Sequence, residues 1–413
     1  MLQCGRGPAG CLWGRQLWGR AVGEAFKAVV DMKLATFGLA AGAALALAFS
    51  IHDARAQSTI ETAAKQMIMV DYKTGAVLAE KNADEIMPPS SMSKIMTMYV
   101  VFDHLKQGRL SLDSDIPVSE KAWRKQGSKM FVRLNSRVKV EDLIRGVVVQ
   151  SGNDACIALA EALYGSEEKF SEELTRRGKL MGLKNTNFTN STGWPDDRHV
   201  TTARDLAILA KRMIADFPDY YRYYSELEYT YNDIKQGNRN PLLYKNLGAD
   251  GLKTGHTEAA GYGLTASVKR DNRRLILVVN GLKSMRERAA ETERLIEWGF
   301  REYENVALFK AGQPVEKAEI WLGHDKTVPM VVNDDVEVTL LRRARRDMKA
   351  TVIYEKPVAA PVAAGQEIGK LRVTAPNMQS IEVPLVAQQS VERLGFLSRI
   401  GAAAQYLVFG AAR

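Results

Sequence analysis

The sequence predicts an α+β fold in which helices cover a sheet, followed by a small all-β domain and a terminal amphipathic helix. Strand patterns stand on both sides of a run of helical patterns, and this order favours a helix-covered sheet over βαβ repeats. After about Val306 the chain changes to short alternating runs broken by Gly, Pro, Asn and Asp, which predicts β structure. We therefore expect domains over residues 57–305 and 306–387, and a helix over residues 388–413.

The first part of the chain alternates from Ile60, which predicts two short strands around a turn at Lys73–Gly75. A second pair of strands is expected over residues 261–282, with its turn near Asp271 and Asn272. Between and after these pairs the apolar residues recur with helical spacing. Helices are expected over residues 91–108, 140–150, 154–165, 202–218 and 287–303.

The last segment places its apolar residues on one helical stripe, with arginines mainly elsewhere. It is too often interrupted by Arg and Gly to span a bilayer comfortably. An amphipathic helix with basic residues can lie in the membrane interface, and we expect this helix to contact the inner-membrane surface. A helix docked on its own protein is the alternative.

The N-terminal residues 1–56 are expected to be an upstream extension and a signal peptide. A new start at Met32 has a positive residue, then an almost wholly apolar run over Leu34–Ser50. The small-x-small sequence Ala54–Ala56 then precedes Gln57, as at a cleavage site. An uncleaved membrane anchor is the alternative. We expect a mature chain that begins near Gln57 and is exported.

Composition limits the class of protein. The chain has 413 residues, 46% hydrophobic and 25% charged, as in a folded protein of two ordinary domains. Its net charge of +9 indicates mild attraction to anionic surfaces, and a generic basic surface is the alternative. No block of Lys and Arg with interleaved aromatics is present, so no nucleic-acid partner is expected. Cys156 is the one cysteine after Gln57, and we expect it to be buried in a helix.

Several kinds of catalytic site are excluded by their missing motifs. The histidines form no recognisable Ser-His-Asp pattern, and no G-x-S-x-G sequence is present. No H-E-x-x-H or Cys/His cluster indicates a metal, and no cofactor is expected. A serine nucleophile would therefore need another base, and a lysine one helical turn away supplies it in S-x-x-K.

Three S-x-x-K sequences occur, and their surroundings separate them. Ser136 lies in an alternating stretch, where residues three apart face opposite sides of a strand. Ser166 precedes two glutamates and is typical of a helix N-cap. Ser91 opens a largely apolar helix with Lys94 in its first turn. Burial there would lower the pKa of Lys94 and make it a base, although Ser91 alone could be a helix cap.

Two further motifs follow in order. Ser151-Gly152-Asn153 interrupts two helices, where a hydroxyl and an amide can project into a cleft. Lys253-Thr254-Gly255 stands ahead of a predicted strand, with small residues that let a substrate backbone approach. The order S-x-x-K, S-x-N, K-T-G is that of the penicillin-recognising serine enzymes.

The sequences "PPSSMSKIMT", "LIRGVVVQSGNDACIALAE" and "DGLKTGHTEAAGYGLTAS" make the resemblance close. From about Ala64 to the C-terminus the chain resembles the low-molecular-mass penicillin-binding proteins of the 5/6 type, the D-alanyl-D-alanine carboxypeptidases of peptidase family S11. The resemblance implies a β-lactamase/transpeptidase-like domain, with an antiparallel sheet flanked by helices. It implies that Ser91 is the acylated nucleophile, Lys94 its base, and Ser151 and Asn153 the residues that relay protons and hold the substrate amide.

The resemblance also implies a set of substrate contacts. Lys253 and Thr254 would meet the terminal carboxylate beside Gly255, and backbone N–H groups of Ser91 and His256 would form the oxyanion hole. Two arginines match positions where the family has arginines near the K-T-G strand, and arginine suits a carboxylate. A surface ion pair is the alternative for each of these two residues, Arg239 and Arg288.

The function implied is that of an exported serine carboxypeptidase, periplasmic and peripherally attached to the inner membrane. Its substrate would be the peptidoglycan pentapeptide, in cell-wall maturation and cell shape, and β-lactams would acylate it. A serine β-lactamase, a DD-endopeptidase and a non-catalytic wall-binding protein are the alternatives. No convincing Glu-x-x-x-Asn loop, which class A β-lactamases use for deacylation, is found between Asn153 and Lys253.

Overall fold

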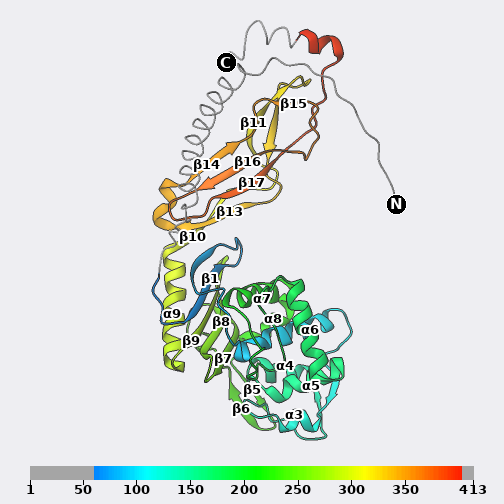
Figure 1. Cartoon of the computed structure of the whole chain (residues 1–413), viewed down its shortest axis with the longest axis vertical. Helices are drawn as coiled ribbons and strands as arrows, with labels where there is room; N and C mark the ends of the chain where they lie inside the picture. The colour runs from blue at the N-terminus through cyan, green and yellow to red at the C-terminus, as the bar shows by residue number, and fades with distance from the viewer. Residues whose placement is uncertain (1–59, 402–413) are drawn as a thin grey trace, which may run out of the picture. The chain divides into compact units, whose positions relative to one another are not determined.

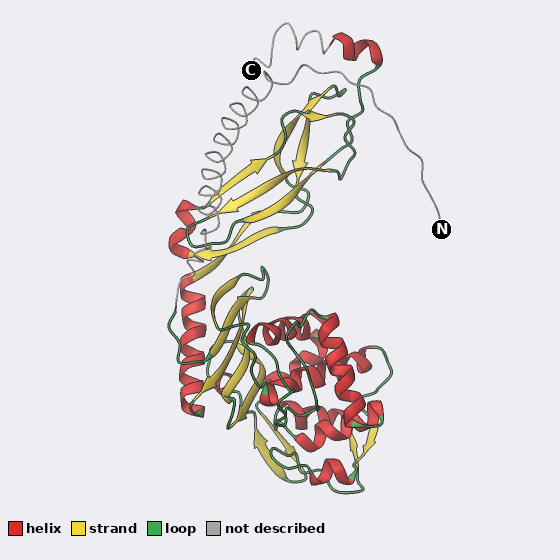
Figure 2. Cartoon of the chain, viewed as in Figure 1, coloured by secondary structure: helices red, strands yellow, loops and turns green. Residues whose placement is uncertain are grey.

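The computed structural model describes residues 60–401 (Figure 1). The expected signal peptide, the start of the mature chain and residues 402–413 of the expected terminal helix lie outside these described residues. The predicted α+β class is confirmed: a helix-covered sheet is followed by a sheet-rich C-terminal part (Figure 2).

The central sheet has five antiparallel strands in the order β2-β1-β9-β8-β7. Alternate residues of its strands enter two different cores. Ile276 and Val278 pack with the helical face, whereas Leu275 and Leu277 pack with the face that also holds Leu295. This alternation is the period of two that places successive side chains on opposite faces. The strands are β1 (Gln66–Asp71), β2 (Val77–Lys81), β7 (Ala249–Thr257), β8 (Gly261–Arg270) and β9 (Arg273–Leu282).

Helices cover both faces of this sheet. Helix α9 (Met285–Glu302) packs against β8 and β9 on one face, and the other helices gather on the opposite face (Figures 1 and 2). Helix α2 is enclosed among these helices, and almost every side chain along it is buried. The helices of this group are α2 (Lys94–Lys106), α3 (Glu120–Arg124), α4 (Val140–Val148), α5 (Asn153–Tyr164), α6 (Glu167–Leu180), α7 (Ala203–Asp216) and α8 (Pro218–Tyr221).

Short elements connect these helices. Two antiparallel strand pairs, β3 with β4 and β5 with β6, and three 3₁₀ turns lie outside the main sheet. Their bounds are β3 (Asp115–Pro117), β4 (Arg137–Lys139), β5 (Glu228–Tyr231), β6 (Ile234–Gly237), η1 (Ser90–Ser93), η2 (Arg222–Ser225) and η3 (Pro241–Tyr244).

Three local expectations were wrong in detail. Ser91 does not open the α-helix: it lies in η1, and α2 begins at Lys94. The K-T-G residues, expected ahead of a strand, lie inside β7. The helix expected to stop at Pro218 ends at Asp216, and Pro218 begins α8, since proline is tolerated in the first turn of a helix.

The C-terminal part is built of strands, as predicted. Strand β10 (Tyr303–Phe309) pairs with β13, and six strands form a sheet in the order β14-β16-β17-β12-β11-β15. The 3₁₀ segment η4 (Arg342–Asp347) joins β13 to β14. The strands are β11 (Pro314–Trp321), β12 (Thr327–Val331), β13 (Val336–Leu341), β14 (Lys349–Ile353), β15 (Val358–Ala359), β16 (Glu367–Thr374) and β17 (Ile381–Ala387).

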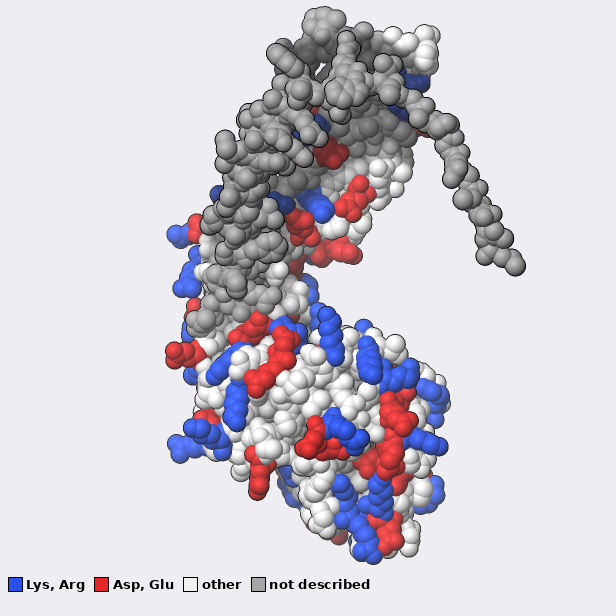
Figure 3. Space-filling view, viewed as in Figure 1, with Lys and Arg blue, Asp and Glu red and all other residues white. Residues whose placement is uncertain are grey.

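A terminal helix occupies residues 396–401, and its apolar side chains Phe396, Leu397 and Ile400 are exposed. Within residues 60–401 no helix is long and apolar enough to cross a membrane. Figure 3 shows Lys and Arg interleaved with Asp and Glu on the visible face, not one continuous basic field.

Candidate active site

Ser91 and Lys94 meet at the junction of η1 and α2. Lys94 is the first residue of α2, and its Nζ donates a hydrogen bond to Ser91 Oγ at 2.9 Å. Ser90, which precedes Ser91, has a φ of 50°, in the left-handed region that non-glycine residues rarely adopt. Such strained residues collect at sites where the surrounding fold holds them, and this one sets the direction of the turn that carries Ser91.

Lys94 is fully buried and holds two other partners besides Ser91. Its Nζ donates to Asn153 Oδ1 at 2.8 Å and to the Thr192 carbonyl at 2.5 Å. Burial lowers the pKa of Lys94 from 10.5 to about 8, because an enclosed ammonium loses its hydration. When the nitrogen loses its proton, its lone pair can accept the Ser91 Oγ–H, and this arrangement is what proton removal from that hydroxyl requires.

The S-x-N motif lies where α4 ends and α5 begins. Asn153 is the first residue of α5, and Ser151, two residues earlier, is buried with a φ of 61°. Asn153 Nδ2 donates to the Gln126 carbonyl at 2.8 Å, so one side chain joins Lys94 to the loop around residue 126. A Cβ at Gly127 would lie 2.8 Å from this same nitrogen, which is why the loop needs glycine there.

Asp154 fixes that loop from the other side. Its carboxylate accepts the backbone N–H groups of Met130, Phe131 and Val132 at 2.9 to 3.2 Å. A buried carboxylate needs such donors, and three of them hold residues 126–132 against the start of α5.

The K-T-G residues of β7 pack against the turn that carries Ser91. A Cβ at Gly255 would lie 3.0 Å from the Pro89 carbonyl oxygen, so a larger residue there would force the turn to shift. Thr257 Oγ1 lies 3.3 Å from Ser90 Oγ. Lys253 and Thr254 are both buried beside this contact. Burial, followed by the charge on Lys94, holds the pKa of Lys253 well below 10.5.

The two predicted arginines are joined to each other and to the site. Arg239 Nη1 donates to Ser128 Oγ at 2.5 Å, and Arg288 Nη2 donates to the Arg239 carbonyl at 3.3 Å. The Arg288 guanidinium stands 5.9 Å from the centre of the Tyr262 ring. Tyr262 stacks on His256, with 3.9 Å between ring centres, and His256 itself is exposed.

Neither arginine forms an ion pair with any residue between 60 and 401, so the surface ion-pair alternative has no partner there. The Nε of Arg288 is buried without a hydrogen-bond partner among those residues. Burial lowers the pKa of Arg288 from 12.5 to about 10. A buried donor without a partner is costly, and an anion entering the site would satisfy it.

The charges of the site are unbalanced. The carboxylate of Asp154, which interacts with Lys94, is committed to backbone N–H groups. Burial lowers the pKa values of Lys94, Lys253 and Arg288, and the positive charge of Arg239 lowers all three further. Such a site is suited to a ligand that carries a carboxylate. These cations are Lys94, Lys253, Arg239 and Arg288.

Comparison with known proteins agrees with this geometry. Residues 52–284 match the family described as peptidase S11, D-alanyl-D-alanine carboxypeptidase. The chain belongs to the S11 family. Residues 303–393 match the family described as the C-terminal domain of penicillin-binding protein 5, so both parts of the fold have counterparts.

Relatives of this S11 chain share most of its length. It is 40% identical over 375 residues to D-alanyl-D-alanine carboxypeptidase DacC of Escherichia coli K12, covering 88% of this chain and 94% of that relative. Penicillin-binding protein 5 of Haemophilus influenzae superimposes with a TM-score of 0.75 at 38% identity, covering 81% of this chain and 99% of that one. Penicillin-binding protein D2 of Listeria monocytogenes, in an ampicillin-bound form, gives 0.54 at 29% identity, covering 59% and 99%.

The other S-x-x-K sequences of this S11 chain lie elsewhere. Ser166 caps α6, since its Oγ accepts the Lys169 N–H at 3.2 Å, as predicted. Ser136 is not inside a strand, because β4 begins at Arg137, and its Oγ donates to the Arg133 carbonyl. Cys156 is buried in α5, as predicted.

Sequence reasoning missed one segment that contacts Lys94, residues 190–194. The Thr192 carbonyl touches the lysine, and Trp194 lies under Lys125, whose Nζ stands 4.2 Å from the ring centre. Asn190-Ser-Thr-Gly193 is a turn-forming sequence, which is the one local signal it carries. Nothing in its spacing relates it to Ser91. Among residues 60–401 no group of His, Cys, Asp and Glu is placed to hold a metal.

Proposed function

We propose that this chain is a serine-type D-Ala-D-Ala carboxypeptidase that removes the terminal D-alanine from peptidoglycan stem peptides. The observation that carries the proposal is the 2.9 Å hydrogen bond from Lys94 Nζ to Ser91 Oγ, inside an environment that lowers the pKa of the lysine to about 8. Family membership and the names of the relatives support the substrate class.

In the proposed first step, the neutral Lys94 amine takes the proton of Ser91 Oγ as this oxygen bonds to the carbonyl carbon of the D-Ala-D-Ala peptide bond. The carbonyl oxygen becomes an oxyanion, held by the backbone N–H groups of Ser91 and His256. The C–N bond then breaks, and the departing D-alanine nitrogen gains a proton relayed through Ser151. Asn153 holds the substrate amide.

In the second step, water attacks the ester on Ser91. Lys94, again neutral, takes a proton from the water, and Ser91 Oγ leaves with a proton to regenerate the hydroxyl. A β-lactam would follow the first step and stay on Ser91, because its ring-opened product does not leave.

The terminal carboxylate would be held by Lys253, Thr254, Arg239 and Arg288 beside Gly255. Support for this part comes from the unbalanced positive charge and from the unpartnered Nε of Arg288. A carboxylate that enters such a site makes charge-assisted hydrogen bonds to donors that are otherwise left in a poorly hydrated place.

The decisive experiment compares two substrates of the full chain: a stem pentapeptide and the same peptide with a C-terminal amide. Released D-alanine or D-alaninamide is measured, with mass spectrometry of the shortened peptide. We expect the amide to react slower by roughly 30-fold or more, because its loss of charge leaves buried cations unpaired.

Equal rates on both peptides would contradict carboxypeptidase specificity and favour the endopeptidase alternative. Rapid turnover of nitrocefin would favour a β-lactamase. The structure offers little for that alternative: the Glu228–Asn232 match to Glu-x-x-x-Asn spans the β5–β6 hairpin. There Glu228 pairs with Lys235, and Asn232 Nδ2 donates to the Phe131 carbonyl.

We also propose the division into residues 57–305 as catalytic domain, 306–387 as accessory domain and 388–413 as membrane-association helix, after a removed segment 1–56. The first family match ends at residue 284 and the second begins at residue 303, which supports the main division. The chain would be exported to the periplasm and attached peripherally to the inner membrane.

Membrane attachment is testable at the terminal helix. Replacing Phe396, Leu397 and Ile400 together by serine should lower binding to phosphatidylethanolamine/phosphatidylglycerol vesicles by roughly 10-fold or more, because their exposed apolar surface would no longer enter the interface. Cosedimentation measures this, and D-alanine release should be unchanged. Ile353→Ser, at an exposed apolar residue of β14, is the control. Unchanged vesicle binding of the triple variant would refute the attachment.

A further inference from the structure

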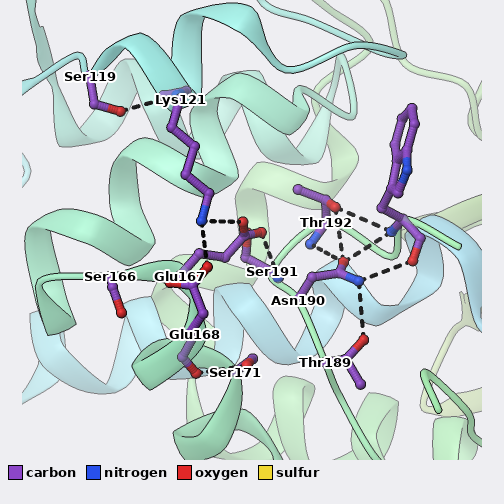
Figure 4. Close-up of polar contacts among 12 residues, drawn as sticks. Ser119, Lys121, Ser166, Glu167, Glu168, Ser171, Thr189, Asn190, Ser191 and Thr192 are labelled. Atoms are coloured by element: carbon purple, nitrogen blue, oxygen red, sulfur yellow. Dashed lines mark hydrogen bonds and ion pairs between the residues drawn. The ribbon is translucent and has the colours of Figure 1, made fainter. Parts of the chain in front are cut away.

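The side chain of Asn190 organises the segment whose Thr192 carbonyl accepts a hydrogen bond from Lys94. Its Oδ1 accepts four hydrogen bonds from the residues that follow it, and its Nδ2 donates back to the Trp194 carbonyl at 3.0 Å, so the segment is wound around one amide (Figure 4). The four donors are Thr192 N, Thr192 Oγ1, Gly193 N and Trp194 N, at 2.8 to 3.1 Å.

One peptide group links this turn to the lysine. In the peptide group between Thr192 and Gly193, the N–H donates to Asn190 Oδ1 at 2.8 Å and the carbonyl accepts from Lys94 Nζ at 2.5 Å. Because a peptide group is planar and rigid, fixing the direction of the N–H also fixes the direction of the carbonyl. Asn190 therefore sets the place at which the lysine nitrogen is held.

A second anchor holds the same segment. Glu167 Oε1 accepts both the N–H of Ser191, at 3.1 Å, and its Oγ, at 2.7 Å (Figure 4). Lys121 pairs with the other oxygen of this carboxylate at 3.2 Å. The Ser191 carbonyl accepts from Thr97 Oγ1 at 2.7 Å, and Thr97 lies in the same turn of α2 as Lys94.

The segment also closes over the turn that carries Ser91. Gly193 has a φ of 78°, and a Cβ there would lie 1.9 Å from the Ser90 carbonyl oxygen. Only a glycine in the left-handed conformation permits this contact. The turn wound around Asn190 thus covers the lysine and excludes water from it.

We propose that Asn190 is a positioning residue for the reaction: by fixing the Thr192–Gly193 peptide group, it holds the Lys94 amine against Ser91 Oγ and keeps it dry. This inference rests on the proposed function, in which Lys94 is the base. Asn190 does not touch the reacting atoms. Its effect passes through the carbonyl of Thr192.

The pH dependence of the base reports on this role. Burial is the largest cause of the lowered pKa of Lys94, so water admitted by a loosened turn raises that pKa toward 10.5. The active neutral form then appears at higher pH. The other charged or titratable groups that face Lys94 belong to different elements. They are Cys156 and Asp154 of α5, Lys253 of β7, Arg239, Lys125, whose Nζ stands over the Trp194 ring, and His199, whose Nδ1 accepts the Thr189 N–H.

The test compares Asn190→Ala and Asn190→Asp with Asn185→Ala, a control whose exposed side chain lies in the same connection. D-alanine release and penicillin acylation are followed from pH 6 to 10, with unfolding temperatures. For Asn190→Ala we expect kcat to fall by roughly 10- to 100-fold, with KM changed less than threefold, and the acidic limb of the profile to move to higher pH.

Asn190→Asp keeps an oxygen that accepts the same four donors. At a pH above the acidic limbs of both variants, the kcat of Asn190→Asp should exceed that of Asn190→Ala by at least about threefold. Its acidic limb should also move to higher pH, because a carboxylate beside the turn favours the ammonium. Asn185→Ala should match the wild type in every measurement.

The inference would be overturned if kcat of Asn190→Ala were within twofold of the wild type. It would also be overturned if the unfolding temperature of Asn190→Ala fell while the acidic limb of its pH profile stayed at the wild-type pH. If that variant does not fold, Asn190→Gln takes its place, because the added methylene displaces the oxygen that accepts the four donors. An Asn190→Gln protein with the wild-type acidic limb and the wild-type kcat would then overturn the inference. Ser91→Ala in the same series keeps the two ideas apart. Activity in Ser91→Ala refutes the proposed function, whereas its inactivity beside a wild-type-like Asn190→Ala refutes only the positioning role.

Discussion

Ser91→Ala is expected to abolish both D-alanine release and covalent labelling by a fluorescent penicillin. The variant removes the one oxygen that Lys94 Nζ approaches from η1, at 2.9 Å, so no acyl-enzyme can form. We expect kcat to fall by roughly 10⁴-fold or more, because removing a nucleophile also removes the benefit of its base. Gel fluorescence after labelling and a D-alanine assay measure the two losses separately.

The matched control for Ser91→Ala is Ser136→Ala, which changes the serine of another S-x-x-K sequence. Ser136 is a surface residue whose Oγ donates only to the nearby Arg133 carbonyl. This control should label and turn over as the wild type does. A Ser91→Ala protein that labels as well as the wild type would show that the acylated residue lies elsewhere.

Lys94→Met is expected to slow acylation by roughly 10²- to 10⁴-fold, the usual contribution of a general base. Methionine has a similar length and suits the apolar surroundings of α2, so the fold should persist. Wild-type acylation by penicillin should rise with pH through about 8, because Lys94 loses its proton there and only the neutral amine can act. In Lys94→Met the rate of acylation should no longer rise with pH through this range. Stopped-flow acylation across pH measures both effects.

Stability provides a second measurement on Lys94→Met. The lysine has a lower pKa in the folded protein than the usual 10.5, so between about pH 8 and 10.5 the unfolded chain binds more protons. The free energy of unfolding of the wild type should therefore rise with pH across this window. Lys253 contributes in the same direction to both proteins, and the variant should show a smaller slope. Lys169→Met, at an exposed residue of α6, is the control. If acylation of Lys94→Met still rises with pH as in the wild type, Lys94 is not the base.

Sequence patterns predicted the helix-covered sheet, the β-rich C-terminal part and the set of motif residues, because each depends on local periodicity or spacing. Ser91 and Lys94 are three residues apart, and this spacing alone brings their side chains together on a helical turn. The order of S-x-N and K-T-G further along the chain adds information that no single motif carries.

Other features depend on contacts that spacing does not encode. Thr192 contacts Lys94 across 98 positions of the sequence, and the hydrogen bonds of Asn190 and Glu167 to its segment form only when the chain has folded. K-T-G escaped assignment to a strand because Gly251, Gly255 and His256 interrupt the apolar alternation there. In the folded chain, the pairing of β7 with β8 and the contact of Gly255 with Ser90 outweigh the weak strand preference of these residues.

The enclosure of α2 separates the parts of this site that can change in evolution from those that cannot. Lys94 is anchored in a helix whose neighbours fill the core on every side, so a substitution near the base must also fit that core. The exposed side chains of Gln126 and Trp194 lie at the surface beside Asn153, outside this restriction. New preferences for the stem peptide would therefore arise at these two side chains, while the chemistry stays constant.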